Sequence, residues 1–268
     1  MLPGFERNPG SERSAGTLSV LAMALFLCGI CPVVAEEAVA PTVLEKPTAA
    51  GVLQPSRFTY RATYRRGLPI QGTAVRELSR LPDGRWNYRF EVRSLLVDLT
   101  ENVVLDWHEG RLRPHHYSYE RDGWPTDRRG TVTFDWHTLT VVNDIGRHPW
   151  SMSIPADALD KLGYQLQLRL DLQAGLRHMT YALADGGKLK QATFQVVGEE
   201  VLDTEHGPVR SVIVERVPEE GNRRRSRLWL ATDWYYLVVR MKQKEADGET
   251  YEIFLHSARI GDLRIGSP

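Results

Sequence analysis

The sequence predicts a mainly β protein: a curved antiparallel sheet or half-open β-barrel of about a dozen strands, with one main helix near residues 156–170. Three observations predict this fold class. Apolar and polar residues alternate with period two over many short segments, beginning with Phe58 and Tyr60. Tight-turn signals such as Asp83–Gly84 join neighbouring segments. A single long segment breaks the alternation with apolar residues at helical spacing.

The candidate strands follow one another along the chain through short turns. Strands joined in this way form antiparallel meanders, whereas parallel sheets need longer crossover connections. Read in order, the candidate strands are 56–65, 72–81, 86–93, 95–107, 111–120, 130–136, 139–143, 177–184, 188–203, 209–217, 226–231, 235–245 and 249–260.

The helix is expected near 156–170, with Ser153 as its N-cap and Gly175 as its C-terminal stop. Gly163 weakens the middle of this helix, and residues 165–170 also alternate like a strand, so the position of its end stays open. Four leucines recur there at helical spacing: Leu159, Leu162, Leu166 and Leu170.

The first 35 residues predict a signal peptide. Residues 17–30 form an apolar run that is short for a membrane span, which needs about 20 residues. Arg7 and Arg13 precede this run, and the small residues at 33–35 offer a cleavage site. The expected localisation is therefore the periplasm. The alternative is an N-terminal segment that stays uncleaved and anchors the protein.

The rest of the chain is expected to be a flexible linker over 36–55 and a single β-rich domain over 56–264. The linker is rich in Ala and Pro and has no aromatic residues. Both cysteines, Cys28 and Cys31, lie in the N-terminal segment, so the mature chain has no thiol nucleophile and no disulfide. No later apolar run is long enough to predict a transmembrane span in the mature chain.

Composition and missing motifs narrow the function classes. The 34 basic and 34 acidic residues balance, whereas nucleic-acid-binding domains are usually basic, so no nucleic-acid partner is expected. The chain lacks a Gly-x-Ser-x-Gly nucleophile motif, a Gly-x-x-x-x-Gly-Lys phosphate loop and a dinucleotide-binding glycine pattern. These absences favour a non-enzymatic protein without a cofactor, although they do not exclude an enzyme.

A repeated tripeptide is the sharpest local feature, because 106–108 and 135–137 both read Asp-Trp-His. In a strand, Asp and His at i and i+2 share one face while Trp points to the other. Two such ends could hold a divalent metal only if they met. The simpler interpretation has Trp in the core and the polar residues in solvent, so we predict no metal site.

Aromatic residues on two nearby strands form the candidate ligand site. Tyr60 and Tyr64 share a face of the first strand by period two, and Trp86, Tyr88 and Phe90 share a face of a later strand. This aromatic face is expected to look inward, toward either a packed core or a cavity for an apolar or lipid-like small molecule. The sequence leaves these two alternatives open.

Several short motifs along the chain match those of one protein family: Phe58–Tyr60, Gly110–Pro114 with Tyr117 and Tyr119, Phe134–Trp136, the region from Asp157 to Gly175, and Trp229–Asp233 continuing to Arg240. Through these motifs the chain resembles the domain-of-unknown-function family numbered 3108 across most of 56–262. The resemblance implies a secreted or periplasmic β-rich protein of unassigned activity, with a fold similar to the curved sheets of periplasmic lipoprotein carriers. It implies no catalytic residue.

Three functional hypotheses follow. The first is a periplasmic or envelope-associated, non-enzymatic protein that binds a lipid-like or apolar ligand on a concave aromatic sheet face. The second is a structural or interaction module with a filled core, which works through a protein partner at the envelope. The third, with the least support, is a metal-dependent hydrolase built on the two Asp-Trp-His tripeptides.

Overall fold

The computed structural model describes residues 52–66, 68–95, 97–123, 126–146, 149–218 and 223–266, which belong to one compact unit. The predicted signal peptide (1–35) lies outside the described residues, and so does the predicted linker as far as residue 51. The last four linker residues are described, and there Val52 is completely buried in the core.

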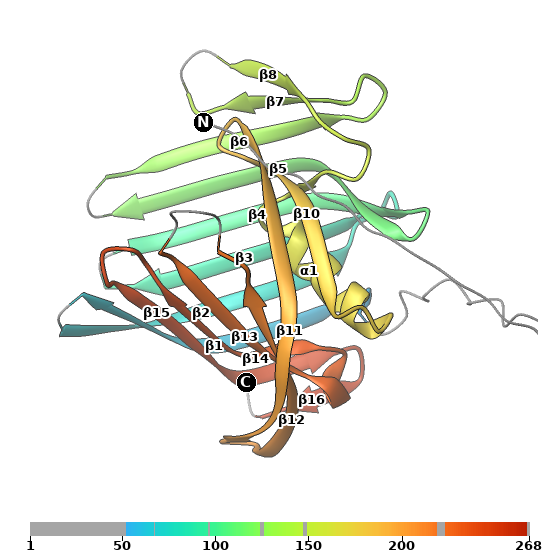
Figure 1. The fold of residues 1–268 in the computed structure, drawn as a ribbon. Helices are drawn as coiled ribbons and strands as arrows, with labels where there is room; N and C mark the ends of the chain where they lie inside the picture. Colours follow the sequence, from blue (N-terminus) through green and yellow to red (C-terminus); the bar gives the residue numbers. More distant parts are fainter. Residues whose placement is uncertain are drawn as a thin grey trace, which may run out of the picture. The chain divides into compact units, whose positions relative to one another are not determined.

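Sixteen strands in the described part of the chain form a single sheet (Figure 1). The first meander consists of β1 (Ser56–Arg66), β2 (Leu68–Arg80), β3 (Trp86–Ser94), β4 (Val97–His108), β5 (Arg111–Gly123), β6 (Arg128–Asp135), β7 (Thr140–Asp144) and β8 (Trp150–Ser153). The remaining elements are β9 (Leu159–Asp160), α1 (Gly163–Gln173), β10 (His178–Asp185), β11 (Lys188–Thr204), β12 (Gly207–Arg216), β13 (Arg225–Ala231), η1 (Thr232–Trp234), β14 (Leu237–Lys244), β15 (Thr250–Ile260) and β16 (Leu263–Ile265).

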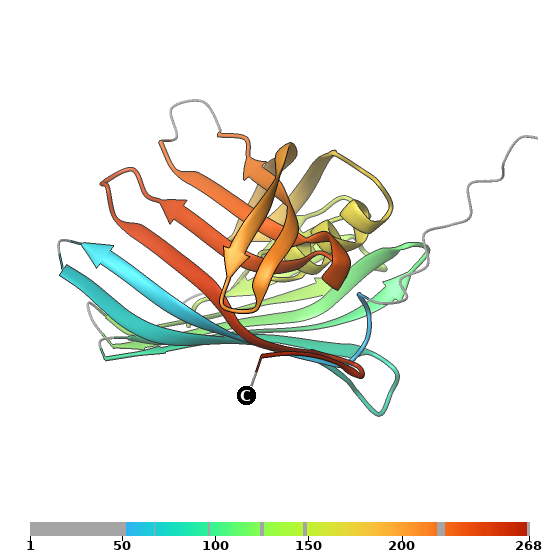
Figure 2. The ribbon, with the colours of Figure 1, turned by 90° about the horizontal axis from the view of Figure 1, so that it is seen from below.

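The sheet is a continuous path from β8 at one end to β9 at the other. Strands β8 to β1 lie in reverse chain order, β1 pairs with β15, and β15 to β9 continue the path, while β16 pairs with the far part of β15. All pairings are antiparallel except the short one between β9 and β10. Figure 2 shows the second meander, in orange and red, folding back over the first, in blue and green. The predicted fold class, a curved and unclosed antiparallel sheet, is therefore confirmed.

Three strands exceed the thirteen that the sequence indicates: β8, β9 and β16. They are four, two and three residues long. Such segments are too short to show a period-two pattern, which explains why the alternation missed them.

The main helix exists, but the expected position near 156–170 is wrong at its start. The structure places β9 at Leu159–Asp160 and begins α1 at Gly163. Oδ1 of the fully buried Asp160 accepts hydrogen bonds from the backbone N–H groups of Leu162 (2.7 Å) and Gly163 (2.8 Å). These bonds satisfy donors that a helix start leaves free, so Asp160 and not Ser153 caps the helix.

Each end of α1 requires a glycine, for a different steric reason. A Cβ on Gly163 would collide with Asp160 Oδ2. At the other end, Gly175 has φ +85°, and its N–H donates to the Leu172 carbonyl while Leu176 N–H donates to that of Asp171. This left-handed termination confirms the predicted stop at Gly175.

The helix packs on one face of the sheet, which we call the inner face. Buried leucines of α1 belong to one hydrophobic cluster with Trp86, Tyr88 and Leu105 of the first meander. A second cluster gathers β1 with β13, β14 and β15 around Phe58 and Tyr60. The helix therefore fills part of the concave side of the sheet.

Candidate functional site

The five aromatic residues predicted from sequence lie on the inner face. The strand register places them there: Tyr60 pairs with Ala74, and Ala74 pairs with Val92, so the aromatic positions of β1 and β3 lie on the same face of the sheet. Three of them are deeply buried, with exposed fractions of 1% for Tyr60, 1% for Tyr88 and 6% for Trp86. Phe90 and Tyr64 are half-buried.

Phe90 and Tyr64 belong to a half-buried apolar surface on the inner face, which we call the inner apolar band. Tyr64 stacks on Tyr251 of β15 with ring centroids 4.9 Å apart. Hydrophobic and aromatic side chains are the usual lining of ligand sites. The members of the band, from β1, β3, β4, β5 and β14, are Ala62, Tyr64, Phe90, Val92, Leu99, Tyr119 and Met241.

Two buried guanidinium groups lie next to this band, and we call them the arginine pair: Arg76 of β2 and Arg169 of α1. Their exposed fractions are 4% and 3%. The Arg76 guanidinium carbon lies 4.8 Å from the centre of the Phe90 ring, and that of Arg169 lies 5.4 Å from the Phe58 ring. Phe58, Arg76 and Phe90 form one cross-strand row, so the two arginines face the same small region.

Neither arginine has a carboxylate within ion-pair distance among the described residues. Arg169 donates from Nε and Nη2 to the Tyr235 carbonyl at 3.2 and 3.1 Å, whereas Arg76 has only a 3.5 Å contact from Nη1 to the Tyr88 hydroxyl. Burial lowers the pKa of Arg169, and the charge of Arg76 lowers it further. Among the buried polar atoms that have no hydrogen-bond partner in the described part of the chain, three lie in this region: Tyr60 Oη, Arg76 Nε and Arg169 Nη1.

A second buried polar group lies in the same cross-strand row as Arg76. Glu101 is 8% exposed, accepts a hydrogen bond from the Tyr117 hydroxyl at 2.6 Å and pairs with Lys161 Nζ at 2.9 Å. This carboxylate is therefore already engaged. Next to it, burial raises the pKa of Asp160 to about 6, and the Glu101 charge adds to this effect.

These buried charges were not predicted from the sequence. A signal for Arg76 existed, because it stands between Ala74 and Leu78 at an inward position of the period-two pattern. No comparable signal existed for Arg169, because polar residues alternate with leucines along α1 and nothing in this pattern separates Arg169 from Gln165, Gln167 and Asp171.

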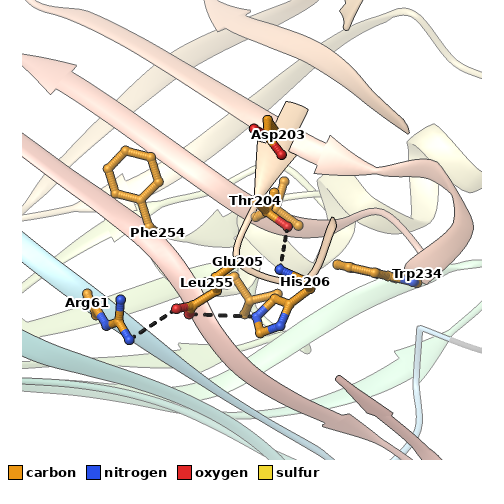
Figure 3. A pocket seen from close by; sticks show the side chains of 9 residues that line it. Arg61, Asp203, Thr204, Glu205, His206, Trp234, Phe254 and Leu255 are labelled. Carbon is orange, nitrogen blue, oxygen red and sulfur yellow. Dashed lines mark hydrogen bonds and ion pairs between the residues drawn. The ribbon is translucent and has the colours of Figure 1, made fainter. Parts of the chain in front are cut away.

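A pocket of about 250 Å³ lies on the opposite face of β1, β14 and β15, where the turn between β11 and β12 reaches them (Figure 3). The Glu205 carboxylate binds Arg61 Nη2 at 3.1 Å and His256 Nδ1 at 2.9 Å. The hydrogen bond from His256, with the charge of Arg61, holds the pKa of Glu205 below its usual range. The residues that line the pocket are Arg61, Asp203, Thr204, Glu205, His206, Trp234, Val239, Phe254 and Leu255.

The network in this pocket fastens the β11–β12 turn to β1 and β15. Its carboxylate is neutralised by two cationic or donor groups, so it is poorly suited to act as a base. We interpret this pocket as a structural contact and not as the candidate site.

The two Asp-Trp-His tripeptides are placed separately, at the ends of β4 and β6 with β5 between them. Asp106 binds His115 Nε2 at 2.9 Å, whereas Asp135 Oδ1 accepts from the backbone N–H groups of His137 and Thr138. Within the described ranges, no group of three or more His, Cys, Asp and Glu side chains is placed to hold a metal ion.

Replacing both His108 and His137 with Ala should change the free energy of unfolding by less than about 1 kcal/mol, because both side chains are exposed. Urea denaturation measures this change. Elemental analysis of the purified wild-type protein provides the second readout. Stoichiometric zinc that is lost in the double variant would contradict the prediction that these tripeptides bind no metal.

No helix in the described ranges is long and apolar enough to cross a membrane.

No functionally curated protein matches the chain in sequence. Solved structures that are similar to it include the following two. One is a β-barrel-like protein of the domain of unknown function DUF1849 from Brucella abortus, with 14% identity, a TM-score of 0.55 and coverage of 78% of this chain and 99% of that one. The other is MucB, with 12% identity, a TM-score of 0.31 and coverage of 81% and 57%.

The first of these similarities supports the fold alone, because the identity is low. The second is too weak to support an argument. A family described as "Protein of unknown function (DUF3108)" matches residues 59–255, which is most of the described chain and includes the inner apolar band and the arginine pair. The chain therefore belongs to the DUF3108 family.

Proposed function

We propose that this protein is a non-enzymatic, envelope-associated binding protein of the periplasm that holds a lipid-like ligand on the inner apolar band. The observation that carries the proposal is the band itself: apolar side chains from five strands that stay half-buried although α1 lies on the same face. Burying such a surface under an acyl chain is favourable by roughly 25 cal/mol per Å².

The five predicted aromatic residues take two different parts in this proposal. Tyr64 and Phe90 belong to the band and would contact the ligand directly. Tyr60, Trp86 and Tyr88 are buried next to the band on the same face and would form the wall of the site. The predicted signal peptide, with its apolar run and small-residue cleavage site, supports export to the periplasm.

A second candidate function has a specific observation in its favour. Helix α1 fills the deep part of the concave side, and Trp86 and Tyr88 pack with it. A filled core favours a structural or interaction module that acts through a protein partner at the envelope. The two candidates differ in whether apolar molecules occupy the band. The described residues offer no metal-ligand cluster, so we propose no hydrolase.

The test uses the full chain, expressed in a Gram-negative host and purified from the periplasmic fraction. Intact mass should match a chain that begins near Glu36. Organic extraction followed by mass spectrometry should recover lipid from the wild type and several-fold less from Phe90→Ala, because the variant loses a central side chain of the band. Phe254→Ala is the matched control: Phe254 is also a partly exposed aromatic residue, but on the opposite face.

Two results would contradict the proposal. A species that retains residues 1–35 in the membrane fraction would refute cleavage and favour the uncleaved anchor. A wild-type protein that carries no extractable lipid and binds no added fatty acid would leave the filled-core interaction module as the better description.

A further inference from the structure

The arginine pair has a charge that the described protein does not balance. A buried ion costs several kcal/mol unless a counter-charge or a full set of hydrogen bonds compensates it. Arg169 is partly compensated by the Tyr235 carbonyl, but Arg76 has only the long contact to Tyr88. The carboxylate in the same cross-strand row, Glu101, is taken by Tyr117 and Lys161.

The unsatisfied donors are close together in the fold. Tyr60 lies on the same face as Arg76, on the neighbouring strand, and the electrostatic environment of the Tyr60 hydroxyl includes both arginines. Burial raises the pKa of Tyr60, so its hydroxyl keeps its proton and can donate it in a hydrogen bond. Two guanidinium groups and a phenol, each with a donor that lacks an acceptor, are a donor set suited to an oxyanion.

The donor set also lies next to the inner apolar band. The Arg76 guanidinium stacks on Phe90, and Phe90 is a half-buried member of the band. An anion at Arg76 would therefore have apolar surface directly beside it. A free anion would use only the donors, whereas an amphipathic molecule would use both features.

We propose that the arginine pair and the Tyr60 hydroxyl bind the anionic end of the ligand, a carboxylate or phosphate group, while its apolar chain lies on the inner apolar band. This inference rests on the proposed lipid-binding function and adds the chemical class of the ligand: an acyl chain with a single anionic end. Arg76 is expected to contribute most to binding of the anionic end, because Arg169 already donates to the Tyr235 carbonyl.

The test compares three probes on the delipidated protein by isothermal titration calorimetry: oleate, oleyl alcohol and inorganic phosphate. The wild type should bind oleate at least about tenfold more tightly than oleyl alcohol, which is the expected size for loss of a charge-assisted hydrogen bond. Arg76→Met should remove this preference by weakening oleate about tenfold, with oleyl alcohol unchanged. Arg89→Met, on the exposed outer face of β3, should bind all probes as the wild type does.

The Arg76→Met variant should fold, because Met replaces a buried charge with an apolar chain of similar length. If it does not, the oleate-to-alcohol preference of the wild type still decides the inference. Equal binding of oleate and oleyl alcohol by the wild type would overturn the inference and leave the proposed function intact. Phosphate binding that depends on Arg76, with neither oleyl probe bound, would support the anion site and refute lipid binding. Binding of no probe would overturn both.

Discussion

Replacing Trp86 with Ala should lower the free energy of unfolding by about 3–5 kcal/mol, the usual range for removing a large aromatic side chain from a core. Trp86 is only 6% exposed and belongs to the hydrophobic cluster around α1. The Arg80 guanidinium carbon also lies 4.7 Å from the centre of its ring, and this cation–π contact would be lost as well. Urea denaturation followed by circular dichroism measures the change.

The size of this loss in unfolding free energy distinguishes a filled core from a ligand cavity around Trp86, where α1 packs on the sheet. Trp107→Ala is the matched control, because Trp107 is half-buried and packs on the same cluster, so its loss should be smaller. A loss below about 1.5 kcal/mol for Trp86→Ala would contradict the prediction, since it would mean that part of the ring faces free space or a ligand. Such a result would extend the proposed ligand site from the band down to α1.

The sequence predicted the inner aromatic face correctly because that prediction depends only on strand geometry. Side chains at i and i+2 share a face whatever the strand pairs with, so Tyr60 with Tyr64, and Trp86 with Tyr88, had to point the same way. Whether this face was filled could not be predicted in the same way. The answer depends on how deeply α1 enters the concave side, and α1 comes from a distant part of the chain.

The start of the helix was missed for a related reason. Leu159 and Leu162 fit the helical spacing, but they are buried as parts of β9 and the turn before α1. The spacing of two leucines in so short a segment cannot separate a two-residue strand and a turn from the first turn of a helix. The true start depends on Asp160, a charged residue in the core, and its burial is a tertiary effect.

The pocket under the β11–β12 turn could not be predicted from sequence patterns at all. Its central contact joins Glu205 to His256, which are 51 residues apart. Neither residue stands in a motif, and nothing local indicates that this turn reaches β15. Local patterns predicted the strands and their faces, but they did not predict contacts between distant turns and strands.

The contribution of Asp160 to the free energy of unfolding should decrease as the pH rises from about 4 to about 6. Burial raises the pKa of Asp160 from its ordinary 3.8 to about 6 in the folded state, so the folded protein favours the neutral acid more than the unfolded chain does. The resulting stabilisation is fully present below pH 3.8 and is lost as the pH rises through 6. A shift of about two units corresponds to roughly 3 kcal/mol of unfolding free energy.

Other carboxyl groups oppose this trend, because the pKa values of Asp83, Asp135 and Glu205 are lowered in the folded protein. The variant Asp160→Asn isolates the effect, since Asn keeps an oxygen that can accept from Leu162 and Gly163. The unfolding free energy of the variant minus that of the wild type should increase by up to about 3 kcal/mol between pH 4 and pH 7 and then level off.

Urea denaturation at a series of pH values measures this difference, with Asp157→Asn as the matched control. Asp157 is exposed three residues before Asp160, so its charge stays in solvent and the difference for this variant should change much less. A difference for Asp160→Asn that does not vary with pH would mean that Asp160 stays charged in the folded state. The backbone N–H groups of Leu162 and Gly163, which lower the pKa of Asp160, would then outweigh the effect of burial on this carboxyl group.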